Sequence, residues 1–77
     1  MAETPRIEIR CNRNSAGSYN AHLFLNGKKT TESEWQVHHG DCDAIGLLYE
    51  KAKKAYPSSR IQLMGLDKMC LDKILRA

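Results

Sequence analysis

Residues 19–27 read Tyr-Asn-Ala-His-Leu-Phe-Leu-Asn-Gly, and this stretch gives the strongest indication of the fold. Its apolar side chains recur at every second position, while Asn20, His22 and Phe24 take the positions between them. Asn26-Gly27 is a strong signal for a two-residue hairpin turn, because both central residues of a type I′ turn need positive φ. The stretch therefore predicts a half-buried strand that returns as an antiparallel hairpin.

The segment before it, residues 6–11, alternates in the same way. Ile7, Ile9 and Cys11 share one face, so this segment predicts a second strand whose apolar side enters the core. The residues between the two strands are mostly small and polar and predict a turn or loop. Residues 1–5 predict a frayed N-terminus.

A third strand should follow over residues 28–38, but its apolar side chains have the wrong parity. A two-residue turn puts charged and polar side chains on the core face and leaves Trp35 and Val37 on the opposite face. Either a β-bulge at residues 30–33 brings this pair into the core, or the pair joins Phe24 on an apolar outer face. We expect the bulge, because exposing a tryptophan is costly in a domain with so few aromatic residues.

Residues 41–56 predict the main helix. Asp41 suits the N-cap position, since its carboxylate can accept hydrogen bonds from the first turn, and Pro57 disfavours continuation of the helix. The i, i+3, i+4 spacing of apolar residues predicts one buried helix face, made of Ile45, Leu48, Tyr49, Ala52, Ala55 and Tyr56.

Residues 60–64 then predict a short strand with Ile61 and Leu63 inward. The tail, residues 66–76, predicts a second helix, although a tight turn followed by a short strand at 69–71 also fits its pattern. The order is β-β-β-α-β-α: an α+β fold with a small antiparallel sheet and the main amphipathic helix packed on one face. A chain of 77 residues has room for one core, so we expect a single compact domain over residues 1–77.

Composition excludes several classes of protein. Lysine and arginine total 12 against 9 acidic residues, a net charge of +3, whereas a protein that mimics DNA should be strongly acidic. No apolar run approaches the ~20 residues of a membrane span, and the N-terminus lacks the basic-then-apolar pattern of a secretory signal. We therefore expect a cytoplasmic protein with no membrane contact.

Residues 38–43, His-His-Gly-Asp-Cys-Asp, contain the types of side chain that bind metals or act as nucleophiles. Structural zinc normally needs four ligands at fixed spacings, and His38 and His39 on a strand point to opposite faces. Cys42 lies at a helix start that would favour a thiolate, but its two flanking aspartates oppose that charge. We expect no catalytic residue, no metal and no cofactor.

The cysteine count is odd, with Cys11, Cys42 and Cys70 and no CxxC pair. An odd count in so short a chain makes a poor disulfide framework. The sequence therefore predicts three reduced thiols that pack as small apolar side chains in the cytosol.

With no catalytic residue, metal or cofactor expected, we predict that the protein acts by binding a partner. The sheet face opposite the helix should carry Phe24 among arginine and histidine, and such residues are favoured at interface centres; the alternative is a core Phe24 covered by residues 69–75. Lys51 and Lys54 share a helix face that is either solvated or meets an acidic partner. The candidate partner-binding residues are Arg6, Arg10, His22, Phe24, Lys51 and Lys54.

A nucleic acid is the second candidate partner. Residues 19–56 are similar to the sheet and second helix of double-stranded RNA-binding domains, which read phosphates and 2′-hydroxyls by shape. That family begins this helix with lysines, whereas Asp41 and Asp43 repel phosphate here, and a strand replaces the family's first helix. We therefore expect a protein partner first.

The chain also resembles, over residues 17–76, a family of small phage-encoded anti-CRISPR proteins that inhibit type I systems. The resemblance rests on Gly17-Ser18-Tyr19, Asn26-Gly27-Lys28, Gly40-Asp41, Ile61–Leu63 and Gly65-Leu66-Asp67-Lys68. It implies a phage or mobile-element inhibitor in the host cytoplasm that blocks a CRISPR surveillance complex or its nuclease by protein–protein contact. The family has no common functional motif, so no residue role is carried over. A small phage structural or assembly protein is a further alternative.

Overall fold

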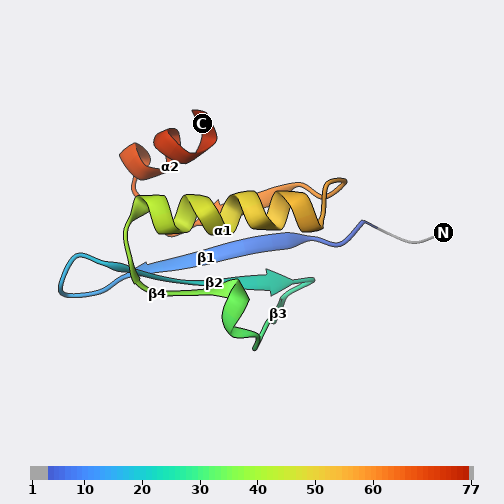
Figure 1. Ribbon diagram of the computed structural model, residues 1–77, viewed down its shortest axis with the longest axis horizontal. Coiled ribbons are helices and arrows are strands. Elements are labelled where there is room, and N and C mark those ends of the chain that lie inside the picture. Colours follow the sequence, from blue (N-terminus) through green and yellow to red (C-terminus); the bar gives the residue numbers. More distant parts are fainter. Residues whose placement is uncertain (1–3, 77) are drawn as a thin grey trace.

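The computed structural model describes residues 4–76, and part of the predicted frayed N-terminus, residues 1–3, lies outside that range. It has the predicted α+β architecture, a five-stranded sheet with two helices (Figure 1). In chain order the elements are β1 (Ile7–Arg13), β2 (Tyr19–Leu25), β3 (Lys28–Lys29), the 3₁₀ turn η1 (Ser33–Trp35), β4 (Gln36–Gly40), α1 (Cys42–Ala55), β5 (Ile61–Met64) and α2 (Lys68–Arg76).

The sheet is mixed, whereas the sequence predicted an antiparallel sheet. β1 pairs antiparallel with β2 on one side and parallel with β5 on the other. β3 and β4 both pair antiparallel with the far edge of β2. β4 and β1 run in the same direction, because both are antiparallel to β2. The helical crossover through α1 then returns the chain as β5 in that same direction, which makes β5 parallel to β1.

The hairpin turn has the predicted chemistry. Asn26 and Gly27 both have positive φ, 52° and 85°, and Leu25 pairs with Lys28 as a two-residue turn requires. The side-chain oxygen Oδ1 of Asn26 accepts a hydrogen bond from the backbone N–H of Arg6 at 2.9 Å, which ties the turn to the start of β1.

The parity conflict in the third strand is resolved by an excursion longer than a simple bulge. Both the N–H and the hydroxyl of Thr30 donate to the carbonyl of Leu23, at 3.0 and 2.9 Å. The chain then leaves the sheet, makes the 3₁₀ turn and rejoins β2 as β4, with Val37 opposite Ala21. Trp35 is thereby buried and Val37 packs against the core, as predicted.

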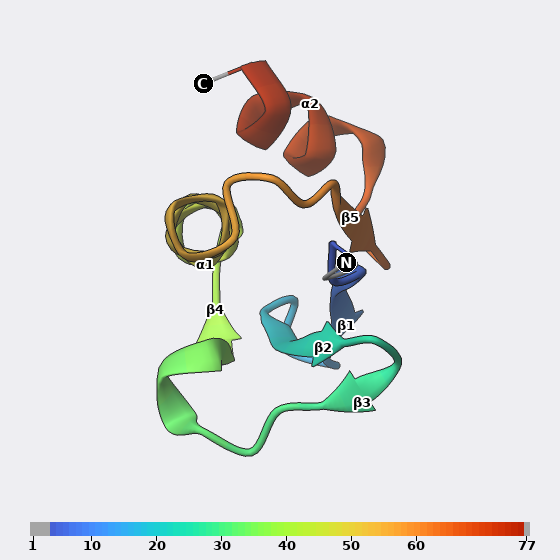
Figure 2. The ribbon, with the colours of Figure 1, turned by 90° about the vertical axis from the view of Figure 1, so that its right-hand side faces the viewer.

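α1 supplies the other half of the core. Its N-cap is Asp41, whose Oδ1 accepts from the N–H of Ala44 at 3.0 Å. Figure 2 shows α1 end-on, packed against one face of the sheet, and Figure 1 shows that it runs along the strands. Ala55, the last residue of α1, is the one exposed member of the apolar helix face that the sequence predicted. The buried apolar residues are Ile7, Ile9, Cys11, Tyr19, Ala21, Leu23, Trp35, Ile45, Leu48, Ala52, Cys70 and Ile74.

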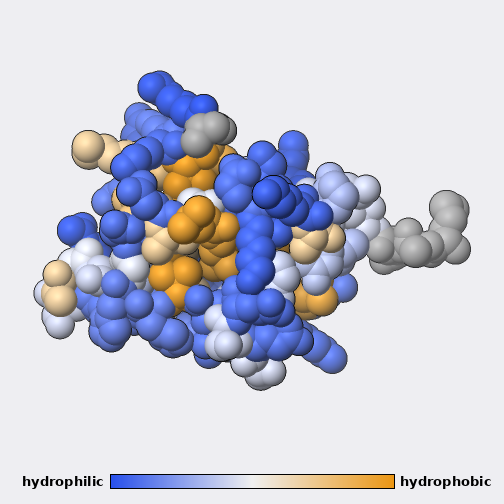
Figure 3. Space-filling model, in the orientation of Figure 1, coloured by the Kyte–Doolittle hydropathy of each residue, from blue (hydrophilic) through white to orange (hydrophobic). Residues whose placement is uncertain are grey.

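The tail forms a helix, α2, which packs on α1 (Figures 1 and 2). Asp67 caps it by accepting from the N–H of Cys70 at 3.0 Å, and Tyr19 donates its hydroxyl to the same carboxylate at 3.1 Å. The hydrogen bond from the backbone of Cys70 makes the largest contribution to lowering the pKa of Asp67, and the hydrogen bond from Tyr19 lowers it further. Apolar surface gathers where the two helices meet (Figure 3), along a groove that includes Gly46, Leu47 and Ile74.

Two of the three cysteines form a disulfide, so the prediction of three reduced thiols is wrong. Cys42 in the first turn of α1 is bonded to Cys70 in the first turn of α2, with Cα atoms 5.6 Å apart. The bond joins residues 28 apart in the chain, a proximity that only the packing of the two helices creates. Cys11 is free and buried, and burial raises the pKa of its thiol to about 11. Because disulfides are rare in reducing compartments, cysteine usage no longer favours the cytosol.

Neither helix in the described part of the chain combines the length and the apolar composition that a bilayer crossing requires.

Candidate binding face of the sheet

Within residues 4–76 both helices lie to one side of the sheet, and no helix covers the other side (Figure 2). We call that uncovered side the open face. The strand register aligns its side chains in two rows across the sheet. One row is Gln62, Glu8, Phe24 and Lys29, and the next is Met64, Arg10, His22 and Gln36.

Arg10 organises the centre of the open face. Its Nη2 donates to Oε1 of Glu8 at 2.9 Å, and its guanidinium carbon lies 4.1 Å from the centroid of the Phe24 ring. The cation therefore rests on the aromatic face while the carboxylate holds it in position. The side chain of Arg10 is 48% exposed and that of Glu8 12% exposed, so the arginine remains accessible and the carboxylate does not.

Phe24 belongs to this surface and not to the core. It is half-buried, beneath Arg10. The alternative, in which residues 69–75 cover Phe24, is wrong because α2 packs on α1, on the other side of the sheet.

Two histidines lie on one side of the arginine, with His22 opposite Arg10 in the strand register and His38 beyond it. The rings of His22 and His38 meet edge to face with centroids 5.9 Å apart, and Nε2 of His38 is 3.1 Å from Oε1 of Gln36. Burial lowers the pKa of His22, and the positive charges of Lys29 and His38 lower it further. The lowered pKa keeps His22 mainly neutral near pH 7, so Arg10 and Lys29, and not His22, supply positive charge to the open face.

His39 contacts other residues than His22 and His38. Its backbone has a φ of 54°, and its N–H donates to Oδ1 of Asn20 at 3.0 Å. Its Nδ1 lies 3.1 Å from Nδ2 of Asn14, in the loop after β1. Residues 4–76 contain no group of three or more histidine, cysteine or acidic side chains placed to hold a metal ion.

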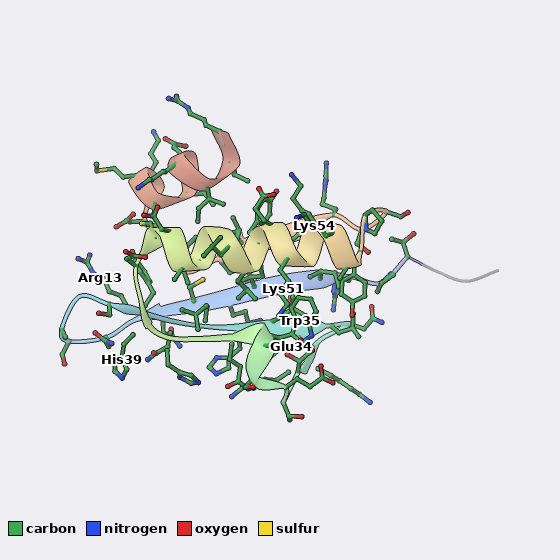
Figure 4. The ribbon with its side chains drawn as sticks, viewed as in Figure 1. Arg13, Glu34, Trp35, His39, Lys51 and Lys54 are labelled. Atoms are coloured by element: carbon green, nitrogen blue, oxygen red, sulfur yellow. A yellow bond between two sulfur atoms is a disulfide. The ribbon has the colours of Figure 1, made fainter. Side chains whose placement is uncertain are left out.

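The six predicted partner-binding residues lie in three places. Arg10, His22 and Phe24 come together on the open face, and Arg6 precedes β1 near the hairpin turn, beside Gly27. Lys51 and Lys54 lie on α1, away from the open face (Figure 4).

The two helix lysines have different surroundings. Nζ of Lys51 donates to the carbonyl oxygen of Glu34 at 3.1 Å and lies 3.4 Å from its carboxylate. The same ammonium lies 5.0 Å from the centroid of the Trp35 ring. Lys51 therefore fastens η1 to α1, whereas Lys54 is exposed and takes part in no ion pair among the described residues.

The sequence prediction missed the part of the open face that comes from later strands, namely Lys29, Gln36, His38, Gln62 and Met64. The alternation of Ile61 and Leu63 already implied that Gln62 and Met64 point outward. The two-residue turn likewise implied that Lys29 lies opposite Phe24. The contribution of β4 could not be read in this way, because the excursion before it changes the parity.

Comparison with known protein families, with curated proteins and with solved structures finds no match to this chain.

Proposed function

We propose that this chain is a non-enzymatic binding protein that contacts a protein partner through the open face. The observation that carries the proposal is the exposed Arg10 stacked on Phe24 and held by Glu8. Arginine and aromatic side chains are the residues that most often dominate binding energy at interface centres. A guanidinium already fixed by a carboxylate and a ring loses little further conformational entropy when a partner binds.

The polar groups of the open face support contact more than catalysis. The carboxylate of Glu8 is engaged by Arg10 and largely shielded from solvent, so it is poorly placed to accept a proton from a substrate. His22 and His38 contact each other, and the ring of His38 also meets Gln36. Ordered side chains of this kind suit recognition of a fixed surface.

The charge of the open face favours an acidic partner. Arg10 and Lys29 carry positive charge there, and the one carboxylate in the two rows is already paired. Complementary potentials speed encounter and suppress wrong partners. The resemblance to anti-CRISPR proteins would make the partner a subunit of a type I surveillance complex or its nuclease, in the cytoplasm of the host cell.

Replacing Phe24 by alanine tests the proposal. We expect the free energy of unfolding to fall by only about 1 kcal/mol, because the ring is half-buried and its main contact is one cation–π pair. Binding to a purified type I surveillance complex, measured by biolayer interferometry, should weaken by about 2 kcal/mol or roughly 30-fold. Lys54→Ala is the matched control, because this exposed residue lies on α1, away from the open face.

The same set of variants distinguishes the alternatives. A strongly destabilised Phe24→Ala protein with unchanged affinity would remove Phe24 from the interface. Loss of binding in Lys54→Ala alone would move the interface to α1. If the wild-type protein ignores the complexes but binds duplex RNA with an affinity that falls steeply with salt, the partner is a nucleic acid.

A further inference from the structure

A hollow of about 550 Å³ lies between the end of α1 and the start of β5, on residues that the open face does not use. Its polar lining comes from Tyr49, Lys53, Tyr56, Ser59 and Arg60. Every one of these side chains can donate a hydrogen bond, and no carboxylate of residues 4–76 lines the hollow. We propose that this hollow is a second binding site, for the phosphate group of a small ligand.

The charges of the hollow are not neutralised within the described protein. Lys53 and Arg60 take part in none of the ion pairs among residues 4–76. Nζ of Lys53 lies 5.4 Å from the centroid of the Tyr49 ring, which keeps the ammonium at the hollow. Arg60 also lines the adjoining hollow together with Arg6, so a third cation adds to the positive potential at this end of the molecule.

The turn after α1 also holds the hydroxyl of Ser59 beside these cations. It is a buried side-chain group without a hydrogen-bond partner in residues 4–76. The backbone N–H of Ser59 donates to the carbonyl of Tyr56 at 3.1 Å, which closes the turn after α1 and fixes the serine beside the hollow. Buried polar groups in folded proteins nearly always have a partner. The hydroxyl oxygen of Ser59 is shielded from solvent, so a phosphate in the hollow would accept its hydrogen bond only after a small shift of the turn.

Phosphate fits this lining better than a carboxylate does. It carries up to two charges and three strong acceptor oxygens, which match two cations and a hydroxyl, and the guanidinium fork of Arg60 can bind two of those oxygens at once. The carbonyl end of α1 contributes roughly half a negative charge, which two cations outweigh. Balancing the helix dipole does not explain why Lys53 and Arg60 meet at the hollow. Lys54 lies in the same last turn of α1 and does not line the hollow.

The test is a titration of the full chain followed by ¹H–¹⁵N NMR, with inorganic phosphate or adenosine monophosphate as the probe and sodium chloride at equal ionic strength as the reference. We expect saturable shifts of backbone amides in residues 56–61 with either phosphate compound. Lys53→Gln and Arg60→Gln should each weaken binding at least 10-fold. Lys54→Gln, the matched control, should stay within twofold of the wild type.

Ser59→Ala separates binding from folding. It should weaken phosphate binding several-fold while the melting temperature stays level or rises, since it removes an unpaired buried hydroxyl. Phe24→Ala should bind phosphate normally, so failure of the open-face proposal would leave this one standing.

The two probes distinguish the source of the phosphate. Tighter binding of adenosine monophosphate would identify a nucleotide, and equal binding would identify the phosphate group alone. Identical shifts in sodium chloride, no saturation, or equal losses in Lys53→Gln and Lys54→Gln would overturn the proposal.

Discussion

Reduction of the Cys42–Cys70 disulfide should lower the free energy of unfolding by about 3–4 kcal/mol. The bond joins residues 28 apart in the chain and so restricts the unfolded state. Reduction removes that restriction, which raises the conformational entropy of the unfolded state and lowers stability. A domain of this size has only about 3–5 kcal/mol from its core, so the reduced protein should be marginally folded. Urea denaturation with and without reductant, followed by circular dichroism, measures the change.

The double variant Cys42→Ser/Cys70→Ser is the control, because reductant should not affect it. Cysteine alkylation supplies an independent count. In the native unreduced protein no cysteine should react, since Cys11 is buried and its pKa is raised to about 11. In urea one cysteine should react without reductant and three with it. Three reactive thiols in urea without reductant would contradict the disulfide.

Replacing Gly65 by alanine should cost about 3–5 kcal/mol of unfolding free energy, the sum of a strained backbone and an overpacked contact. Gly65 follows β5 with a φ of 82°, a conformation that residues with a Cβ rarely adopt. An added Cβ would also overlap the carbonyl oxygen of Cys11 in β1. Thermal and urea unfolding should both register the loss.

Gly17→Ala is the matched control for that loss. Gly17 has nearly the same φ, 89°, but the nearest atom to an added Cβ is the guanidinium of Arg13, 3.8 Å away at the end of a flexible side chain. It should therefore carry only the backbone penalty, about 1 kcal/mol. Equal losses at the two positions would show that β1 and the end of β5 do not approach each other as closely as the structure has them.

The local elements and the fold class follow from the amino-acid sequence alone. The alternation of residues 19–25, the Asn26-Gly27 turn and the Asp41 cap each act through backbone angles or periodicity within a few residues. The first two strands, the hairpin turn and both helices are accordingly present close to their predicted bounds, whereas the strand predicted over residues 28–38 is divided into β3 and β4. The same periodicity placed Arg10, His22 and Phe24 on one face, since residues two apart on a strand share a side.

Tertiary structure decided every feature that joins residues distant in the chain. The parallel pairing of β5 depends on where the α1 crossover ends, and the disulfide depends on how α2 packs against α1. The open face of Phe24 and the hollow that gathers Lys53, Ser59 and Arg60 follow from those same placements. Local periodicity specifies which side of an element is apolar, but many arrangements bury the same apolar sides, and only the closure of the whole core selects one of them.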